Sequence, residues 1–182
     1  MKEIILLISI YFFINEVQAS SKSNIINNLK NIDNLSFNFE QNINDKIESG
    51  NCILSFPKKI FCKYNLSNQK ILVSNGKSIV IKTSSSYYFY ALERTPLNLI
   101  LDKEFLLEKI SIMEERLIDN KFINYRFTED NNEINIFFNK DDYNLIGWQT
   151  IDIYQNLNIT YLSSIIKNQK LKKNLFRLPN QD

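Results

Sequence analysis

The chain has 182 residues with 22 Lys or Arg and 20 Asp or Glu, which gives a formal net charge of +2. This length is that of one ordinary domain with a single core, and its scattered charges lack the basic, aromatic-interleaved patches of nucleic-acid-binding proteins. Histidine is absent, which removes Ser-His-Asp and Cys-His catalysis and the commonest metal ligand, so we expect no enzyme, no metal site and no cofactor.

The chain begins with an apolar run from Ile4 to Ile14, followed by Val17-Gln18-Ala19. The run is too short to span a bilayer, and residues 17 and 19 occupy the positions that a leader peptidase reads. We therefore expect residues 1–19 to be a cleaved signal peptide and residues 20–182 to form one exported, soluble domain. The residue after Ala19 is Ser20 and not cysteine, so we expect no lipid anchor there.

A helix is predicted from Ser23 to Leu35, because apolar residues recur there at the spacing of one helix face and Ser23 can cap its start. A strand is predicted next. Phe37, Phe39 and Ile43 alternate with polar residues, which is the pattern of a strand with one apolar and one solvated face.

Residues 52–64 are predicted to form a hairpin that turns at Pro57-Lys58-Lys59. With that turn, Cys52 and Cys62 lie on one face as diagonal neighbours, roughly 7 Å apart. A disulfide would then need distortion, so we favour two buried free thiols, although an oxidising compartment permits pairing. The apolar face of this hairpin comprises Cys52, Leu54, Phe56, Ile60, Cys62 and Tyr64.

A second hairpin is predicted around Asn75-Gly76, since Asn-Gly favours a turn in which both central residues have positive φ. Its strands are Ile71–Val73 and Ile79–Ile81, and the aromatic residues 87–90 predict another strand. Thr95-Pro96 then predicts a helix start, with Thr95 as cap and Pro96 at the first position. The apolar stripe of that helix is Leu97, Ile100 and Leu101.

The pattern over residues 103–119 is mixed and leaves helix and strand open. Four strands are predicted at residues 122–127, 134–138, 145–154 and 157–166, and Phe176 with Leu178 is predicted to close the sheet. These elements predict a mainly β (α+β) fold: a single curved antiparallel sheet of about ten strands, an incomplete β-barrel, with two or three helices lining or covering its concave face.

Several short motifs occur in a fixed order. They are Phe37-Asn38-Phe39-Glu40-Gln41, then Gly50 with Pro57 and Tyr64, Ile71 to Lys77, Thr95-Pro96-Leu97 with Leu99 to Leu101, Leu145 to Trp148, Asp152, Thr160, and Leu175-Phe176 to Pro179. In order and spacing they resemble the outer-membrane lipoprotein carrier family, LolA, over nearly the whole exported segment.

The resemblance implies a periplasmic carrier of a Gram-negative bacterium. Such a carrier takes triacylated lipoproteins from an inner-membrane ABC-type exporter, shields their acyl chains, and passes them to an outer-membrane receptor, acting as a monomer without nucleic acid. A receptor of the same fold would itself carry a lipid anchor, which the missing cysteine argues against. The open alternative is an envelope lipoprotein- or lipid-binding sensor module of this fold that has no transport activity.

Strand parity and the resemblance together nominate the residues that would line a lipid-binding space, although ordinary core packing is the alternative for each of them. They are Phe37, Phe39, Leu54, Phe56, Ile60, Cys62, Tyr64, Ile79 and Ile81 from strands, and Leu97, Ile100 and Leu101 from a helical lid. One residue departs from the family pattern: Phe56 stands where the family usually has the arginine thought to hold the lid closed. Arg94 is a candidate substitute.

Overall fold

A computed structural model describes residues 20–181 of the chain, except 67, 130 and 152–154. The predicted signal peptide, residues 1–19, lies outside the described residues. The helices are α1 (Ser21–Lys30), α2 (Leu97–Ile100) and α3 (Lys103–Ile112), with one 3-10 turn, η1 (Leu92–Arg94). The strands are β1 (Asn34–Ile43), β2 (Lys46–Ser55), β3 (Lys59–Tyr64), β4 (Ile71–Asn75), β5 (Ser78–Lys82), β6 (Tyr87–Ala91), β7 (Arg116–Ile118), β8 (Phe122–Glu129), β9 (Asn132–Asn139), β10 (Leu145–Ile151) and β11 (Leu157–Lys167).

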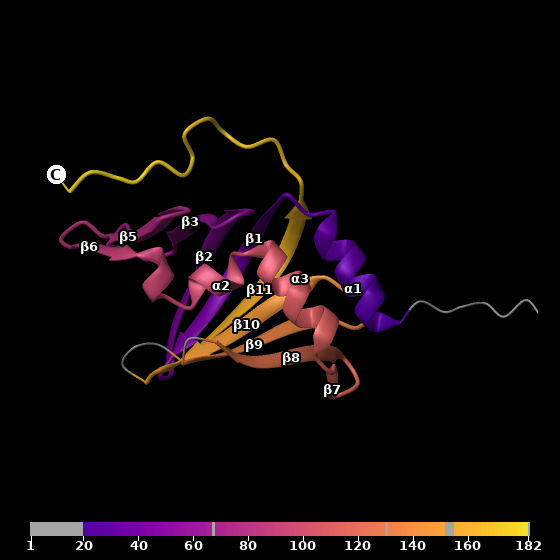
Figure 1. The fold of residues 1–182 in the computed structure, drawn as a ribbon. Coiled ribbons are helices and arrows are strands. Elements are labelled where there is room, and N and C mark those ends of the chain that lie inside the picture. Colours follow the sequence, from indigo (N-terminus) through magenta and orange to yellow (C-terminus); the bar gives the residue numbers. More distant parts are fainter. Residues whose placement is uncertain (1–19, 67, 130, 152–154, 182) are drawn as a thin grey trace, which may run out of the picture.

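The eleven strands of the described part form one antiparallel sheet in the order β6-β5-β4-β3-β2-β1-β11-β10-β9-β8-β7 (Figure 1). Two runs of sequential hairpins meet where β1 pairs with β11, with Leu35 opposite Lys167 and Ile43 opposite Asn158. Strands β6 and β7 are the two edges, so the sheet does not close. The predicted fold, an incomplete barrel with helices on one side, is confirmed.

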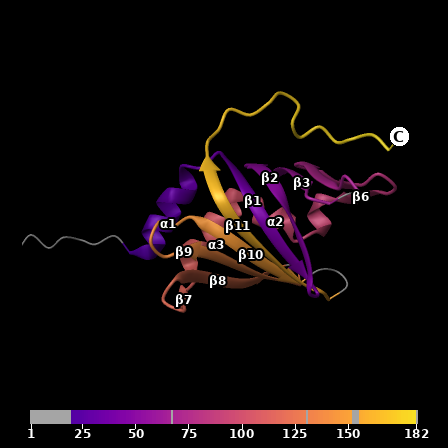
Figure 2. The same cartoon turned by 180° about the vertical axis from the view of Figure 1, so that it is seen from behind.

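The helices of the described residues lie on one face of the sheet, and none of them lies on the opposite face (Figures 1 and 2). Helices α1 and α3 lie side by side and bury Ile25, Leu29, Leu106 and Ile110. These side chains join the inward-facing strand residues in one hydrophobic core. The concave side therefore holds both the core and the space beneath α2.

The first helix differs from the prediction at both ends. It begins at Ser21 because the Ser20 hydroxyl accepts a hydrogen bond from the Ser23 amide at 3.3 Å, so Ser20 is the cap. It ends at Lys30, and Leu35 already belongs to β1, where it pairs with Leu54. A strand partner far along the chain decides this boundary, and local spacing does not contain that information.

The prediction of free thiols is wrong: Cys52 and Cys62 form a disulfide, with their Cα atoms 4.1 Å apart. The two residues are directly opposite in the β2–β3 hairpin, whose turn is Phe56-Pro57-Lys58. This turn lies one residue earlier than predicted, and such a shift moves every cross-strand partner by two positions. Lys58 has φ 65°, a conformation that the sequence did not indicate for a lysine.

The second hairpin is confirmed, but its turn differs from the prediction. Asn75 ends β4, and the two central residues are Gly76 and Lys77, of which Gly76 alone has a positive φ, 97°. The Asn75 side-chain oxygen accepts hydrogen bonds from the amides of Lys77 and Ser78 at 3.0 and 2.9 Å. Glycine at the first central position is the requirement of a type II′ turn.

The helix after Thr95 is shorter than predicted and is not capped by that residue. Pro96 occupies the N-cap position of α2, while the Thr95 hydroxyl donates to the Leu92 carbonyl at 2.8 Å. The undecided segment 103–119 contains helix α3 and then β7. Asp102 caps α3 by accepting a hydrogen bond from the Phe105 amide at 3.2 Å.

The end of the chain does not add a strand. The predicted strand 145–154 is observed as β10 up to Ile151, and residues 152–154 lie outside the described part. Phe176 and Leu178 do not close the sheet, because the described chain after β11 runs without strand structure toward β5 and β6 (Figure 1). There the Lys82 ammonium and the Tyr87 hydroxyl donate to the carbonyls of Asn180 and Pro179, at 2.8 and 3.2 Å.

Candidate functional site

An open cavity of about 610 Å³ lies between the concave face of the sheet and the segment that includes η1 and α2. Most of its surface is contributed by strands β1 to β6, with further residues from β10 and β11. Its wall is formed by Phe37, Phe39, Gln41, Ile43, Cys52, Ile60, Cys62, Tyr64, Lys70, Leu72, Ile79, Ile81, Phe89, Tyr90, Ala91, Trp148, Thr150, Asn158 and Thr160, and its helical cover by Arg94, Thr95, Pro96, Leu97 and Ile100.

The apolar wall follows from strand alternation, because successive residues of a strand point to opposite faces. In β1 this places Phe37 and Phe39 on the concave side. The Phe37 ring contacts the Trp148 ring edge-on, with centroids 6.4 Å apart, and Phe39 contacts Tyr64 in the same way at 4.9 Å. The rings leave the space beside them open, so this part of the wall is apolar and incompletely filled.

Nine of the twelve nominated residues line the cavity, and three do not. Leu54 and Leu101 are completely buried in the adjoining hydrophobic core. Phe56 lies in the β2–β3 turn, partly buried against the core, where the Lys103 ammonium is 5.9 Å from its ring centroid. It belongs to the turn, whereas the sequence had assigned it to the strand, and it is not among the residues that line the cavity.

The sequence did not nominate the polar part of the lining. Gln41 continues the parity of Phe37 and Phe39, so extending the alternation by one step would have found it. Thr150 and Asn158 belong to strands β10 and β11, which reach the cavity only through the β1–β11 pairing. No local sequence pattern predicts that pairing.

One end of the cavity carries a network of polar side chains. The Gln41 side-chain amide donates to the Asn158 side-chain oxygen at 2.9 Å and to the Thr160 hydroxyl at 3.4 Å. The Tyr64 hydroxyl is 3.5 Å from the Gln41 side-chain oxygen. These groups lie toward the β1–β2 turn, beyond the aromatic residues of the same strands.

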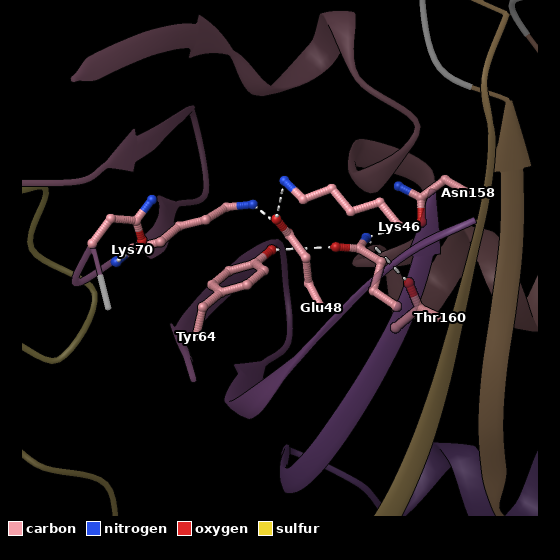
Figure 3. Close-up of polar contacts among 8 residues, drawn as sticks. Lys46, Glu48, Tyr64, Lys70, Asn158 and Thr160 are labelled. Carbon is pink, nitrogen blue, oxygen red and sulfur yellow. Dashed lines mark hydrogen bonds and ion pairs between the residues drawn. The ribbon is translucent and has the colours of Figure 1, made fainter. Parts of the chain in front are cut away.

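Glu48 lies opposite Gln41 in the neighbouring strand and is buried, with 4% of its side chain exposed. The ammonium groups of Lys46 and Lys70 approach its carboxylate from two sides (Figure 3), Lys46 at 3.1 Å, and both form ion pairs with it. Burial raises the pKa of the Glu48 carboxyl, but the hydrogen bonds and charges of both lysines outweigh burial and hold that pKa below its usual value. Glu48 is therefore ionised at neutral pH.

The helical cover is tied to the β2–β3 turn by Lys58. Its amide donates to the Leu101 carbonyl at 2.8 Å, and its ammonium lies 3.2 Å from the Asp102 carboxylate. In the described residues these contacts join the hairpin to the end of α2, at the turn where the family resemblance implied an arginine before the proline. Arg94 lines the cavity, and its role as a substitute for that arginine stays a prediction.

The described residues contain no group of three or more potential metal ligands from His, Cys, Asp and Glu. In the same part of the chain, no helix has both the length and the apolar character that crossing a bilayer requires. The candidate site is the apolar cavity with its polar end.

Comparison with known proteins gives one family match. The family model described as outer membrane lipoprotein carrier protein LolA matches residues 30–179. Among curated protein sequences, none matches this chain.

Solved structures share the architecture at low sequence identity. An uncharacterized conserved protein from Thermus thermophilus aligns with a TM-score of 0.52 and 6% identity, over 90% of this chain and 96% of the other. A LolA superfamily protein from Nitrosomonas europaea aligns with a TM-score of 0.47 and 10% identity, over 88% and 99%. The lipoprotein LppX from Mycobacterium tuberculosis aligns with a TM-score of 0.45 and 11% identity, over 84% and 96%.

Proposed function

This chain belongs to the outer membrane lipoprotein carrier protein family, LolA, and from that membership we propose that it carries lipoproteins across the periplasm. In this proposal it binds the acyl chains of triacylated lipoproteins that an ABC-type exporter releases from the inner membrane. It then delivers them, as a monomer, to a receptor in the outer membrane. The observation that carries the proposal is the open apolar cavity between sheet and helices.

The cavity matches the physical need of such a carrier. Removing one acyl CH₂ from water is worth about 0.8 kcal/mol, so a sixteen-carbon chain gains on the order of 12 kcal/mol when it is fully buried. A protein that solubilises the chain must supply apolar surface for most of this gain. Aromatic and aliphatic side chains of strands β1, β3, β4, β5 and β6, with the disulfide between β2 and β3, supply that surface here.

Release requires that the cavity can open. Leu97 and Ile100 close one side of the cavity from the short helix α2. The chain around α2 is held at one end by the bond from the Leu92 amide to the Lys77 carbonyl, and at the other by the Lys58 contacts. We propose that α2 moves between these two attachments when lipid enters or leaves.

Location belongs to the same proposal. A cleaved signal peptide at residues 1–19 would bring the chain to the periplasm, where oxidising conditions allow the disulfide between Cys52 and Cys62 to form and persist. This compartment lies between the proposed donor and acceptor membranes.

The test uses membrane vesicles that contain the exporter and radiolabelled triacylated lipoprotein. With ATP and the purified protein, we expect label to become soluble and to co-elute with the protein in a one-to-one complex. Label that stays in the membrane, although the protein binds the same lipoprotein in detergent, would overturn transport and favour the sensor alternative.

A matched pair of variants ties the result to the cavity. Leu97→Glu places a carboxylate in the apolar lining, whereas Ile112→Glu makes the same change at a helix position with 71% exposure away from the cavity. We expect Leu97→Glu to lower the soluble label at least tenfold and Ile112→Glu to leave it unchanged. Equal effects of the two variants would show that lipoprotein binding does not depend on this cavity.

A further inference from the structure

The inward-facing rows of the sheet change from apolar to polar along their length. In β1 the lining residues Phe37 and Phe39 are followed by Gln41, with Ile43 at the end of the strand, and in β10 Trp148 is followed by Thr150. Gln41 lies directly opposite Thr160 of β11. A ligand that fits such a cavity has an apolar chain and a polar head at one end.

The charges of the lining have one sign. Among the described lining residues the charged side chains are Lys70 and Arg94, and none is Asp or Glu. Lys70 contributes its ammonium at the polar end, where 18% of its side chain is exposed. The cavity therefore presents positive charge to whatever occupies it.

The carboxylate behind Lys70 does not cancel this charge. Glu48 brings one negative charge, whereas Lys46 and Lys70 together bring two positive ones, so the three side chains shown in Figure 3 keep one net positive charge. A single lysine would neutralise Glu48. The second one, Lys46, is 72% exposed and does not line the cavity, so it offsets Glu48 from the solvent side and leaves the charge of Lys70 for an anion at the polar end.

We infer that the polar end is a subsite for the anionic head, a phosphate or a carboxylate, of a bound acyl lipid. This inference rests on the proposed function for the apolar part of the cavity, which holds the acyl chain. A triacylated lipoprotein carries its chains on neutral amide, ester and thioether groups, so the anionic ligand is a different acyl lipid. Lys70 is the residue that binds the head. Glu48 and Tyr64 hold the Lys70 ammonium in place.

The geometry around Lys70 supports that role. Its ammonium lies 4.1 Å from the centroid of the Tyr64 ring and is also paired with Glu48, so two contacts fix its place. An ammonium has three N–H donors, and Glu48 accepts from one of them. The remaining donors can form charge-assisted hydrogen bonds, which are stronger than neutral ones.

The experiment compares ligands that share a sixteen-carbon chain and differ in the head. A neutral fluorescent dye, N-phenyl-1-naphthylamine, is bound to the purified protein and displaced at pH 7.5. One arm compares palmitate with hexadecanol, and the other compares palmitoyl lysophosphatidic acid with monopalmitoylglycerol. We expect the anionic member to displace the dye at a concentration at least tenfold lower, and the arm that shows this preference identifies the head as carboxylate or phosphate.

Variants assign the preference to Lys70. Lys70→Met keeps the apolar stem and removes the charge, and we expect it to lose the preference while keeping the affinity for the neutral ligands. Lys70→Arg and Lys63→Met, the latter at an exposed position of β3, are expected to keep the preference. If Lys70→Met fails to fold, the comparison of anionic and neutral ligands on the wild-type protein still tests whether the cavity prefers an anionic head.

The outcomes separate the two proposals. Equal displacement by anionic and neutral ligands in both arms would overturn the head subsite while leaving the lipid-binding cavity intact. Failure of the dye and of all four ligands to bind would contradict the proposed function itself. A preference that survives in Lys70→Met would overturn the assignment to Lys70.

Discussion

At the residue scale, the disulfide is the feature most open to a direct test. It joins two directly opposed residues in the wall of the cavity. Cross-links of this kind restrict the unfolded chain, and for a short loop the gain is about 2–3 kcal/mol. We expect the Cys52→Ala/Cys62→Ala double variant to lose about that much free energy of unfolding, measured by urea denaturation. Wild-type protein kept under a reducing agent should show the same loss, and an unchanged midpoint in both would contradict the prediction.

The buried carboxylate makes a second residue-scale prediction, in stability against pH. The pKa of Glu48 is below its ordinary value of 4.5 in the folded protein. The contribution of Glu48 to stability is therefore fully present above pH 4.5 and is lost as the pH falls through its lower folded-state pKa. We expect Glu48→Gln to lose about 1–3 kcal/mol at pH 7, since two ammonium groups lose their shared partner.

The pH profile provides the check on that variant. The difference in free energy of unfolding between wild type and Glu48→Gln should shrink below about pH 4, as the wild-type carboxyl becomes protonated. Glu40→Gln, at an exposed position of β1, is the control and should follow the wild type throughout. A difference that stays constant from pH 7 to pH 3 would show that ionisation of Glu48 does not stabilise the fold.

Residue patterns predicted features that depend on neighbours in the chain, such as which face of a strand is apolar. They missed features that depend on the register between two strands. The alternation around Phe37 and Phe39 placed both side chains in the cavity wall. The same reasoning misplaced the turn before Lys59 by one residue, and this error alone turned an observed disulfide into two predicted thiols. The conformation of Lys58, which has φ 65°, decides that register, and lysine gives no sequence signal for it.

At the scale of elements, β2 and β3 approach each other and β1 too closely for any side chain at Gly50. A Cβ atom there would lie 2.1 Å from the Lys63 carbonyl oxygen and 2.8 Å from the Phe39 ring. We expect Gly50→Ala to lower the free energy of unfolding by about 1–3 kcal/mol, because the backbone would have to move. Asn51→Ala, at the next, exposed position of β2, should change it by less than about 0.5 kcal/mol. Equal stability of the two variants in urea denaturation would contradict this close packing.

At the start of α3, the stabilising effect of a helix cap can be compared with that of an ion pair. Asp102 caps the helix and also pairs with Lys58, and both partners of that pair are partly exposed. Loss of a cap costs about 1 kcal/mol, whereas an exposed ion pair is worth a few tenths. We expect Asp102→Ala to cost about 1 kcal/mol and Lys58→Met clearly less, by chemical denaturation. A larger loss for Lys58→Met would show that the ion pair outweighs the cap.

Local sequence patterns also predicted the presence of helices better than the residues at which they begin and end. Helix α1 begins two residues before its predicted start because Ser20, and not Ser23, is its cap. The undecided segment contains an amphipathic helix and then an edge strand, and its Asp102 cap is visible in the sequence only once the helix is known. Local rules found the elements and left their ends to tertiary contacts.

At the scale of the whole molecule, ligand binding and folding are coupled. A lipid that binds the folded cavity and not the unfolded chain stabilises the protein by about 2.7 kcal/mol when its concentration is 100 times its Kd. For a chain of this size we expect the Tm to rise by roughly 5–10 °C, measured by calorimetry with palmitoyl lysophosphatidic acid. Ile112→Glu should keep the rise and Leu97→Glu should lose it. A rise of equal size in both variants would place the ligand outside the cavity.

The architecture itself was predictable because its strands are sequential hairpins with clear alternation. The exception is the pairing of β1 with β11, which joins the two ends of the described chain and brings Asn158 and Thr160 to the cavity. Such a contact leaves no trace in local periodicity. It accounts for the polar lining residues that the sequence did not nominate.

That central pairing also governs the order in which the protein can fold. Strand β1 is among the first parts of the described chain to be synthesised, yet its partner β11 is the last strand. Until β11 arrives, one edge of β1 has unpaired backbone groups and can associate with other chains. Contacts between distant parts of a chain also slow folding. A nascent chain of this topology therefore cannot complete its sheet while its last strand is still missing.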